Sequence, residues 1–205
     1  MDSEAAPEAT SLLGKPLYRM ELSADAEAIT WLGRRLAYMW RYRHAVDTFS
    51  KGIELHSESF KLYLHRGHRQ VTLRAFDLAI ADLERATALI EGVDDEVEPD
   101  GAPNEAGIPR STSHSNICYH LGLAYYLKAD FENAARVYEV CKEFSRINDD
   151  MLVATADWQY MTYRGLGRDD DAAKVLDDIR EEMDILENGS YHKRLLMYKG
   201  LVDPE

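Results

Sequence analysis

Two stretches of the sequence decide its fold: YLHRGHRQVTLRAFDLAIADLERA at residues 63–86 and HLGLAYYLKADFENAARVYEVC at residues 120–141. Each places a glycine twelve residues before an alanine, and a second small residue seven positions after that alanine. Apolar side chains recur between them at spacings of three and four, which is typical of amphipathic helices. A small residue is needed wherever two helix backbones approach closely. Each stretch therefore predicts two helices packed against each other.

The same spacing recurs along the chain. Gly33 and Gly67 are 34 residues apart, and the positions after them match in register. A weaker copy runs from Tyr160 to Ala172. Self-similarity at a fixed period of this length is the signature of a repeat architecture, in which each unit buries its apolar face against its neighbours.

This pattern resembles the tetratricopeptide repeat (TPR), a pair of antiparallel helices 34 residues long. The resemblance implies an all-α, right-handed superhelical solenoid of antiparallel helix pairs with a C-terminal capping helix. The residues that show the resemblance on the first helices are Leu32-Gly33, Arg66-Gly67 and Leu121-Gly122. On the second helices they are the pairs Ala45/Gly52, Ala79/Ala86 and Ala134/Cys141.

The fourth copy departs from the family pattern. Tyr160 stands where glycine is usual, and Asp169 stands where an aromatic residue is usual. The interval from Ala134 to Ala172 is 38 residues rather than 34. We therefore expect longer helices or a wider turn between the third and fourth repeats.

The chain is expected to divide into an N-terminal extension, two pairs of repeats separated by an insertion, and a cap. Residues 11–22 of the extension are expected to be extended and to contact the first helix. The predicted segments are the extension at 1–25, TPR-like repeats at 26–59 and 60–93 (together 26–93), the insertion at 94–114, repeats at 115–148 and 153–186 (together 115–186), and a capping helix and tail at 187–205.

The insertion between repeats two and three is acidic and rich in proline and glycine, so it is not helical throughout. Loops of this length are usually functional or disordered. One interpretation is a loop folded over one face of the array, with Val97, Ile108 and Pro109 as apolar anchors. The other is a mobile excursion, which this composition permits.

The net charge of the chain limits the classes of partner that it can bind. The chain has 24 Lys and Arg against 37 Asp and Glu, a net charge of −13. This balance argues against nucleic-acid and anionic-membrane binding, since phosphate groups require a basic surface. Residues 26–90 nevertheless carry ten basic and seven acidic side chains, a net +3, whereas residues 91–205 carry twelve and twenty-five, a net −13.

The first residues have neither the basic start nor the apolar core of a signal peptide, so we expect a cytoplasmic protein, or an exported one if a signal was removed. No apolar run is long enough for membrane insertion. Cys118 and Cys141 fall in packing positions of one repeat, and we expect them to be reduced, small buried side chains.

In the resembled family, the first helix of each pair lines a concave groove that accepts a peptide. Carried over position by position, this implies a partner-binding groove that is cationic and aromatic. Lys61, His65 and His68 share one helix face, since they are four and three residues apart. The predicted groove residues are Arg34, Tyr38, Lys61, His65, His68, Asn116, Tyr119, His120, Tyr126 and Trp158.

The sequence thus predicts a non-catalytic scaffold that binds an unidentified protein or peptide partner. No phosphate-binding loop, nucleophile elbow or HExxH motif occurs, and we expect no catalytic residue, cofactor or metal. The alternatives are a small-molecule or metal site built from His65, His68, His120 and the insertion, and self-association through the ends of the array. Trp31, Trp40 and Tyr125 are expected to pack in the core.

Overall fold

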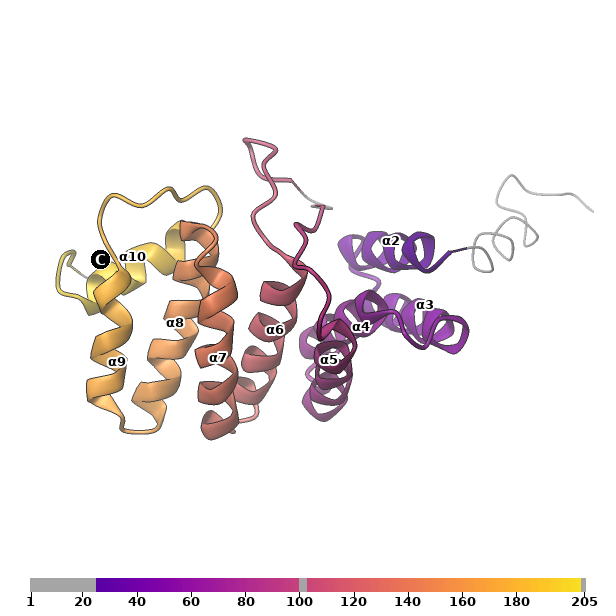
Figure 1. Cartoon of the computed structure of the whole chain (residues 1–205), viewed down its shortest axis with the longest axis horizontal. Coiled ribbons are helices and arrows are strands. Elements are labelled where there is room, and N and C mark those ends of the chain that lie inside the picture. The colour runs from indigo at the N-terminus through magenta and orange to yellow at the C-terminus, as the bar shows by residue number, and fades with distance from the viewer. Residues whose placement is uncertain (1–24, 100–102, 204–205) are drawn as a thin grey trace, which may run out of the picture.

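The computed structural model describes residues 25–99 and 103–203. Within these ranges consecutive helices form antiparallel pairs, and Figure 1 shows them side by side in chain order. The first helices are α2 (Ala26–Tyr38), α4 (Phe60–Thr72), α6 (Ser113–Leu127) and α8 (Asp149–Gly165); the second helices are α3 (Tyr42–Leu55), α5 (Phe76–Ile90), α7 (Phe131–Ser145) and α9 (Asp169–Val175); α10 (Gly189–Tyr198) follows them.

This arrangement is the expected all-α solenoid. The first helices contact one another in order along the array, α2 with α4, α4 with α6, and α6 with α8. They therefore share one face. The predicted N-terminal extension lies outside the described residues except for Asp25, whose side chain accepts a hydrogen bond from the Glu27 amide and begins α2.

The glycines of the repeat lie where the paired helices touch. A Cβ atom on Gly67 would lie 2.7 Å from Cγ of Leu83, and one on Gly122 would lie 2.6 Å from Cζ of Tyr138. Leu83 and Tyr138 are fully buried between their helices. The small residues of the pattern are therefore required by close approach, as the sequence indicated.

Left-handed backbone ends the first helices. Trp40, Arg74 and Ala129 have φ angles of 63°, 61° and 62° and lie in the turns within the first three pairs. The turn directs Trp40 outward, and 81% of it is exposed. The prediction that Trp40 packs in the core is therefore wrong, because it belongs to a turn and not to a helix face. Trp31 and Tyr125 are half-buried.

The fourth pair differs from the others. Its first helix, α8, has 17 residues, and its second helix, α9, has 7 and is followed by a 3₁₀ turn at Leu176–Asp178. Leu195 and Leu196 of α10 are buried against this pair. Leu201, in the predicted capping helix and tail at 187–205, is 46% exposed.

The loop before α10 is tied to the N-terminus of α8. The buried carboxylate of Asp150 accepts hydrogen bonds from the backbone amides of Leu186, Glu187 and Asn188, at 2.9 Å each. Arg110 from the insertion lies 3.3 Å from the same carboxylate. The cap is therefore held by a buried, fully bonded acidic group.

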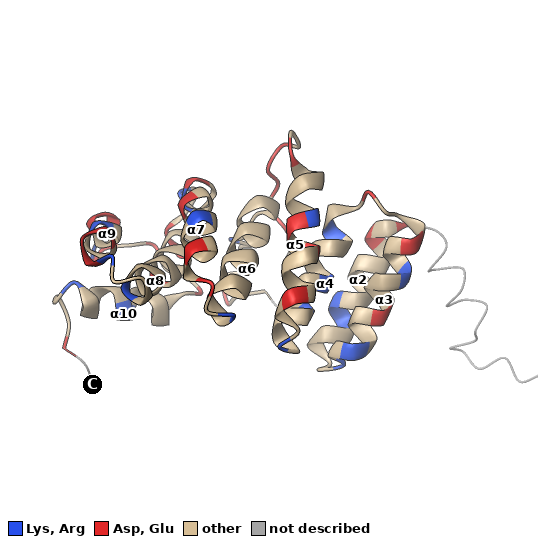
Figure 2. Cartoon of the chain, turned by 90° about the horizontal axis from the view of Figure 1, so that it is seen from below, with Lys and Arg blue, Asp and Glu red and all other residues tan. Residues whose placement is uncertain are grey.

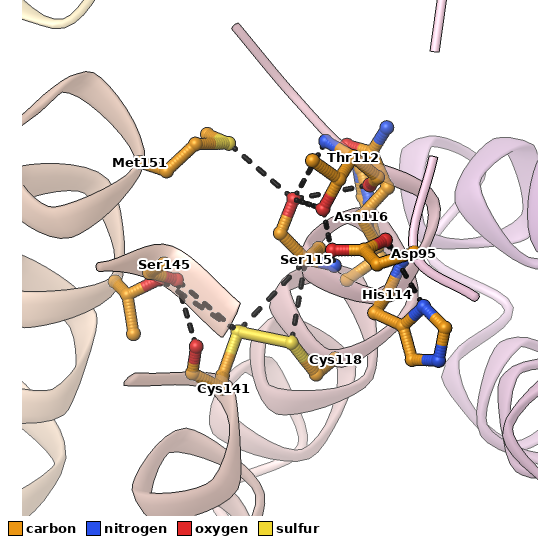
Figure 3. The surroundings of a disulfide bond; sticks show 11 residues. Asp95, Thr112, His114, Ser115, Asn116, Cys118, Cys141, Ser145 and Met151 are labelled. Atoms are coloured by element: carbon orange, nitrogen blue, oxygen red, sulfur yellow. Dashed lines mark hydrogen bonds and ion pairs between the residues drawn. A yellow bond between two sulfur atoms is a disulfide. The ribbon is translucent and has the colours of Figure 1, made fainter. Parts of the chain in front are cut away.

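A disulfide joins Cys118 of α6 to Cys141 of α7 (Figure 3). Both cysteines are buried, as expected, but the prediction that they are reduced is wrong. The packing of the pair explains the bond, because it brings the two Cα atoms to 5.3 Å, within the range that a disulfide spans. Such bonds are rare in reducing compartments. The compartment stays a prediction.

The segment between α5 and α6, residues 91–112, contains no helix among its described residues. Of its predicted apolar anchors, Pro109 is half-buried, but Val97 and Ile108 are 52% and 50% exposed and do not hold it. Polar contacts do so instead. Asn104 donates to the carbonyl of Ile108 at 2.7 Å and to the carboxylate of Glu187 at 2.6 Å.

Candidate functional site

A pocket of about 170 Å³ opens between α2, α4 and α6. Side chains from three consecutive first helices line it, because these helices lie next to one another. The predicted groove residues that the structure brings together here are Arg34, Tyr38, His65, His68, Asn116 and His120.

The three histidines are close together. His65 and His68 lie on α4, and the ring centroid of His68 is 3.8 Å from that of His120 on α6. His120 Nδ1 lies 2.8 Å from the carbonyl oxygen of Asn116. Burial is the main cause that lowers the pKa of His65 and His68 well below the usual value, and it lowers the pKa of His120 to about 4. All three rings are therefore neutral at neutral pH.

Two arginines supply the positive charge of the pocket. Arg34 stacks over the Trp31 ring at 4.4 Å and donates at 2.7 Å to the carbonyl of Pro99. Arg69, one helical turn after His65, also lines the pocket, and its guanidinium has no hydrogen bond or ion pair with any described residue. Burial lowers the pKa of Arg69 from its usual value. A desolvated guanidinium without a carboxylate favours an anionic group in this pocket.

The start of the insertion covers one side of the pocket. Glu98 is 5% exposed, and its Oε2 accepts a hydrogen bond from the Asn116 amide at 2.7 Å. Beside it, Lys61 pairs with Glu96 at 2.6 Å. Of the two interpretations of the insertion, these contacts favour the loop folded over one face of the array.

Apart from Lys61, the remaining predicted residues form a second, aromatic cluster on α6 and α8: Tyr119, Tyr126 and Trp158. Trp158 donates through Nε1 to the hydroxyl of Tyr119 at 2.9 Å, and its ring centroid is 5.1 Å from that of Tyr126. The Tyr119 hydroxyl also lies 3.0 Å from that of Tyr191 on α10. Burial raises the pKa of Tyr119, so it stays protonated. Tyr119 meets His120 edge to face at 5.2 Å, which connects the cluster to the pocket.

Sequence reasoning missed four polar residues of these two groups. Arg69 could have been found, since it follows His65 by four positions and so lies on the same helix face. Glu98, Ser111 and Tyr191 could not, because they come from non-helical segments or from a helix with no repeat register. Only the packing places them here.

Figure 2 shows acidic residues on α9 and α7 and also on α5 and α3, and basic residues on α2 and α4. The described residues contain no group of three His, Cys, Asp or Glu side chains with metal-binding geometry. In those same ranges, no helix is both long and apolar enough to cross a bilayer. The pocket is lined by the three neutral histidines, by Arg34 and Arg69, and by the carboxylate of Glu98.

Comparison with solved structures identifies the fold. MamA superposes with a TM-score of 0.61 at 18% identity, over 91% of this chain and 84% of MamA. YrrB, described as a TPR protein with an unusual peptide-binding site, gives 0.58 at 16% identity, over 95% and 87%. The chain has a TPR-like fold. The first TPR of Spaghetti (RPAP3), bound to the HSP90 peptide SRMEEVD, gives 0.56 at 18% identity, over 71% of this TPR-like chain and 95% of that one.

No known sequence family and no curated protein matches this TPR-like chain. The likeness to the solved structures therefore establishes its fold.

Proposed function

We propose that this TPR-like protein is a non-catalytic scaffold that binds an extended segment of a protein partner along the shared face of α2, α4, α6 and α8. The predicted groove residues are its contact residues: Arg34, Tyr38, Lys61, His65, His68, Asn116, Tyr119, His120, Tyr126 and Trp158. Each of them belongs to a first helix.

One observation carries the proposal. Residues 96–99 lie on this face as an extended segment, and side chains from three first helices hold them. Lys61 and Asn116 bind side chains of the segment, and Arg34 binds a backbone carbonyl. These donors are of the kind that an extended peptide with acidic side chains would need, which supports the proposal.

The aromatic cluster supports the same function. Tyr119, Tyr126 and Trp158 are half-buried, and hydrogen bonds or ring contacts hold each of them in place. Rigid aromatic side chains give contact area at a small entropic cost. Two structures of the same fold, those of RPAP3 and YrrB, are described as bound to a peptide and as having a peptide-binding site.

The experiment is a comparison of full-length baits. The wild-type protein, a Lys61→Glu variant and a Lys51→Glu variant are immobilised, and bound proteins from a native lysate are quantified by mass spectrometry. Lys61 lies on the proposed face, whereas Lys51 is an exposed residue of α3 on a second helix. Both changes reverse one charge, so only their positions differ.

We expect proteins that the wild type and Lys51→Glu capture and that Lys61→Glu loses. His68→Ala and Tyr119→Ala should weaken the same interactions while the helical circular dichroism is unchanged. Equal capture by wild type and by all three face variants would contradict this assignment of the groove.

A second candidate function is the binding of a small polar ligand in the pocket. His65 Nε2 and Glu98 Oε1 are buried, lie 3.9 Å apart and have no hydrogen-bond partner among the described residues. A ligand between them would satisfy both. Native mass spectrometry of the purified protein would then show a bound mass that His65→Ala abolishes, and an unliganded mass for both proteins would exclude it.

A further inference from the structure

The segment Glu96-Val97-Glu98 has the geometry of a bound strand. Val97 pairs with Thr112, the Glu98 amide donates to the Ser111 carbonyl at 3.0 Å, and the Ser113 amide donates to the Glu96 carbonyl at 2.9 Å. Side chains alternate along an extended backbone. Val97 is accordingly 52% exposed, while the glutamates on either side of it contact the helices.

The two glutamates are recognised by different helices. Lys61 of α4 binds the Glu96 carboxylate at 2.6 Å, and Asn116 of α6 binds the Glu98 carboxylate at 2.7 Å. Charged hydrogen bonds of this kind are stronger than neutral ones. A carboxylate thus meets the helices at two positions separated by one residue; that of Glu98 is buried, whereas 53% of the Glu96 side chain is exposed.

The fit of Glu98 is incomplete. Its Oε1 atom has no hydrogen-bond partner among the described residues, and it stops 3.9 Å short of His65 Nε2, which has none either. The Arg69 guanidinium lines the same pocket and has no hydrogen bond or ion pair with any described residue. A buried carboxylate that uses only part of its bonding capacity is a weak ligand, because desolvation offsets much of its attraction. A better-fitting acidic group would displace it.

We propose that residues 96–98 are an intramolecular stand-in for the partner, and that the partner is an extended segment with two acidic side chains at alternate positions, which binds by displacing them. This inference rests on the proposed function and names both its ligand class and its regulation. The net charge of +3 over residues 26–90, which include α2 and α4, complements such a segment.

The stand-in weakens partner binding. A tethered segment competes at an effective concentration on the order of millimolar for a short linker. The site therefore responds only to a partner that binds more tightly than the insertion, or when the insertion is drawn away.

The test uses a fluorescent peptide with the sequence DDEVEPD, that of residues 94–100, added to the full-length protein. Fluorescence anisotropy measures its dissociation constant for the wild type, for Glu96→Ala/Glu98→Ala and for the milder Glu96→Gln/Glu98→Gln. Glu105→Gln changes an exposed glutamate of the same insertion and is the matched control. Circular dichroism shows that each variant is folded.

We expect the peptide to bind the Glu96→Ala/Glu98→Ala variant at least about tenfold more tightly than the wild type or Glu105→Gln, because the tethered competitor is gone. Adding Lys61→Ala to the Glu96→Ala/Glu98→Ala variant should abolish binding of the peptide. The peptide DDQVQPD, which has glutamine in place of the two glutamates, should not bind. A smaller gain is expected for Glu96→Gln/Glu98→Gln, since glutamine keeps the shape and loses the charge.

If the peptide bound the wild type, Glu96→Ala/Glu98→Ala and Glu96→Gln/Glu98→Gln with equal affinity, the proposal that residues 96–98 occupy the partner's site would be wrong. Peptide binding that does not require Lys61 would also contradict it. The outcome is separable from that of the proposed function. Partner capture that depends on Lys61 but is the same for wild type and Glu96→Ala/Glu98→Ala would support the scaffold and refute the stand-in.

Discussion

Gly67 shows how a single residue supports the repeat. A Cβ atom at this position would lie 2.7 Å from Cγ of Leu83 and 3.3 Å from the carbonyl oxygen of Ala79. The side chain of Leu83 is fully buried, so it has little room to move. The close approach of α4 and α5 therefore depends on the missing side chain.

We predict that Gly67→Ala lowers the free energy of unfolding by about 1–3 kcal/mol through overpacking, although alanine is the better helix former. Urea denaturation measures the change. Gly189→Ala is the control, because a Cβ atom there would contact nothing within 4 Å. Equal effects of the two substitutions would contradict the steric explanation.

The pocket histidines should make stability depend on pH. The pKa of His120 is lowered from 6.5 to about 4, mainly by burial, and the pKa values of His65 and His68 are lowered as well. Between about pH 4 and about pH 6.5, the unfolded chain binds more protons than the folded one. The free energy of unfolding therefore falls as the pH falls through this range. Burial raises the pKa of Glu98, which acts in the opposite direction and offsets part of the loss.

We therefore predict that the wild type loses stability between about pH 7 and about pH 5, and that His120→Gln loses less. Urea denaturation at the two pH values gives both differences. A pH dependence that is the same in the two proteins would show that His120 is not the responsible group.

At the scale of an element, α10 is attached to α8 by a charge pair. Asp157 of α8 is fully buried, and Arg194 of α10 donates to its carboxylate from Nε at 2.7 Å and from Nη2. Burial raises the pKa of Asp157, and the arginine opposes that shift. Arg194 therefore favours the charged form of this carboxylate.

We predict that Arg194→Ala destabilises the protein by about 2–3 kcal/mol, because it leaves a buried carboxylate without its partner. Arg164→Ala removes an arginine of α8 whose ion pair with Asp169 is exposed, and should cost less than about 1 kcal/mol. Thermal and urea unfolding of both variants measure the difference. A similar loss in each would mean that α10 is held by its apolar contacts alone.

For the whole molecule, the disulfide links two neighbouring helices, α6 and α7, near the middle of the array. It closes a loop with a sequence separation of 23 residues. A cross-link of this length is expected to stabilise the fold by about 3 kcal/mol, chiefly by restricting the unfolded chain.

We predict that a reducing agent lowers the melting temperature of the wild type and leaves that of Cys118→Ala/Cys141→Ala unchanged. Thiol titration of the unfolded, unreduced protein should find no free cysteine in the wild type. Two free thiols together with an unchanged melting temperature would show that the pair is reduced in solution.

Much of the fold could be predicted from the sequence, because helix packing requires small and large residues at fixed intervals. Gly67 and Leu83, or Gly122 and Tyr138, carry this requirement in their spacing alone. The same periodicity placed His65 and His68 on one helix face. It failed for Trp40, since a turn residue can have the spacing of a helix residue and still point outward.

The sequence by itself determined the helix pairs, their order and the polar side chains of the first helices, since these follow from local periodicity and from contacts between neighbours in the chain. Only the tertiary structure decided which residues from other segments of the chain contact those side chains. Glu98 reaches the pocket, Tyr191 reaches Tyr119, and Cys118 bonds to Cys141 through contacts that have no period. Such contacts depend on the path of non-helical segments and on the distance between packed helices, which residue spacing does not encode.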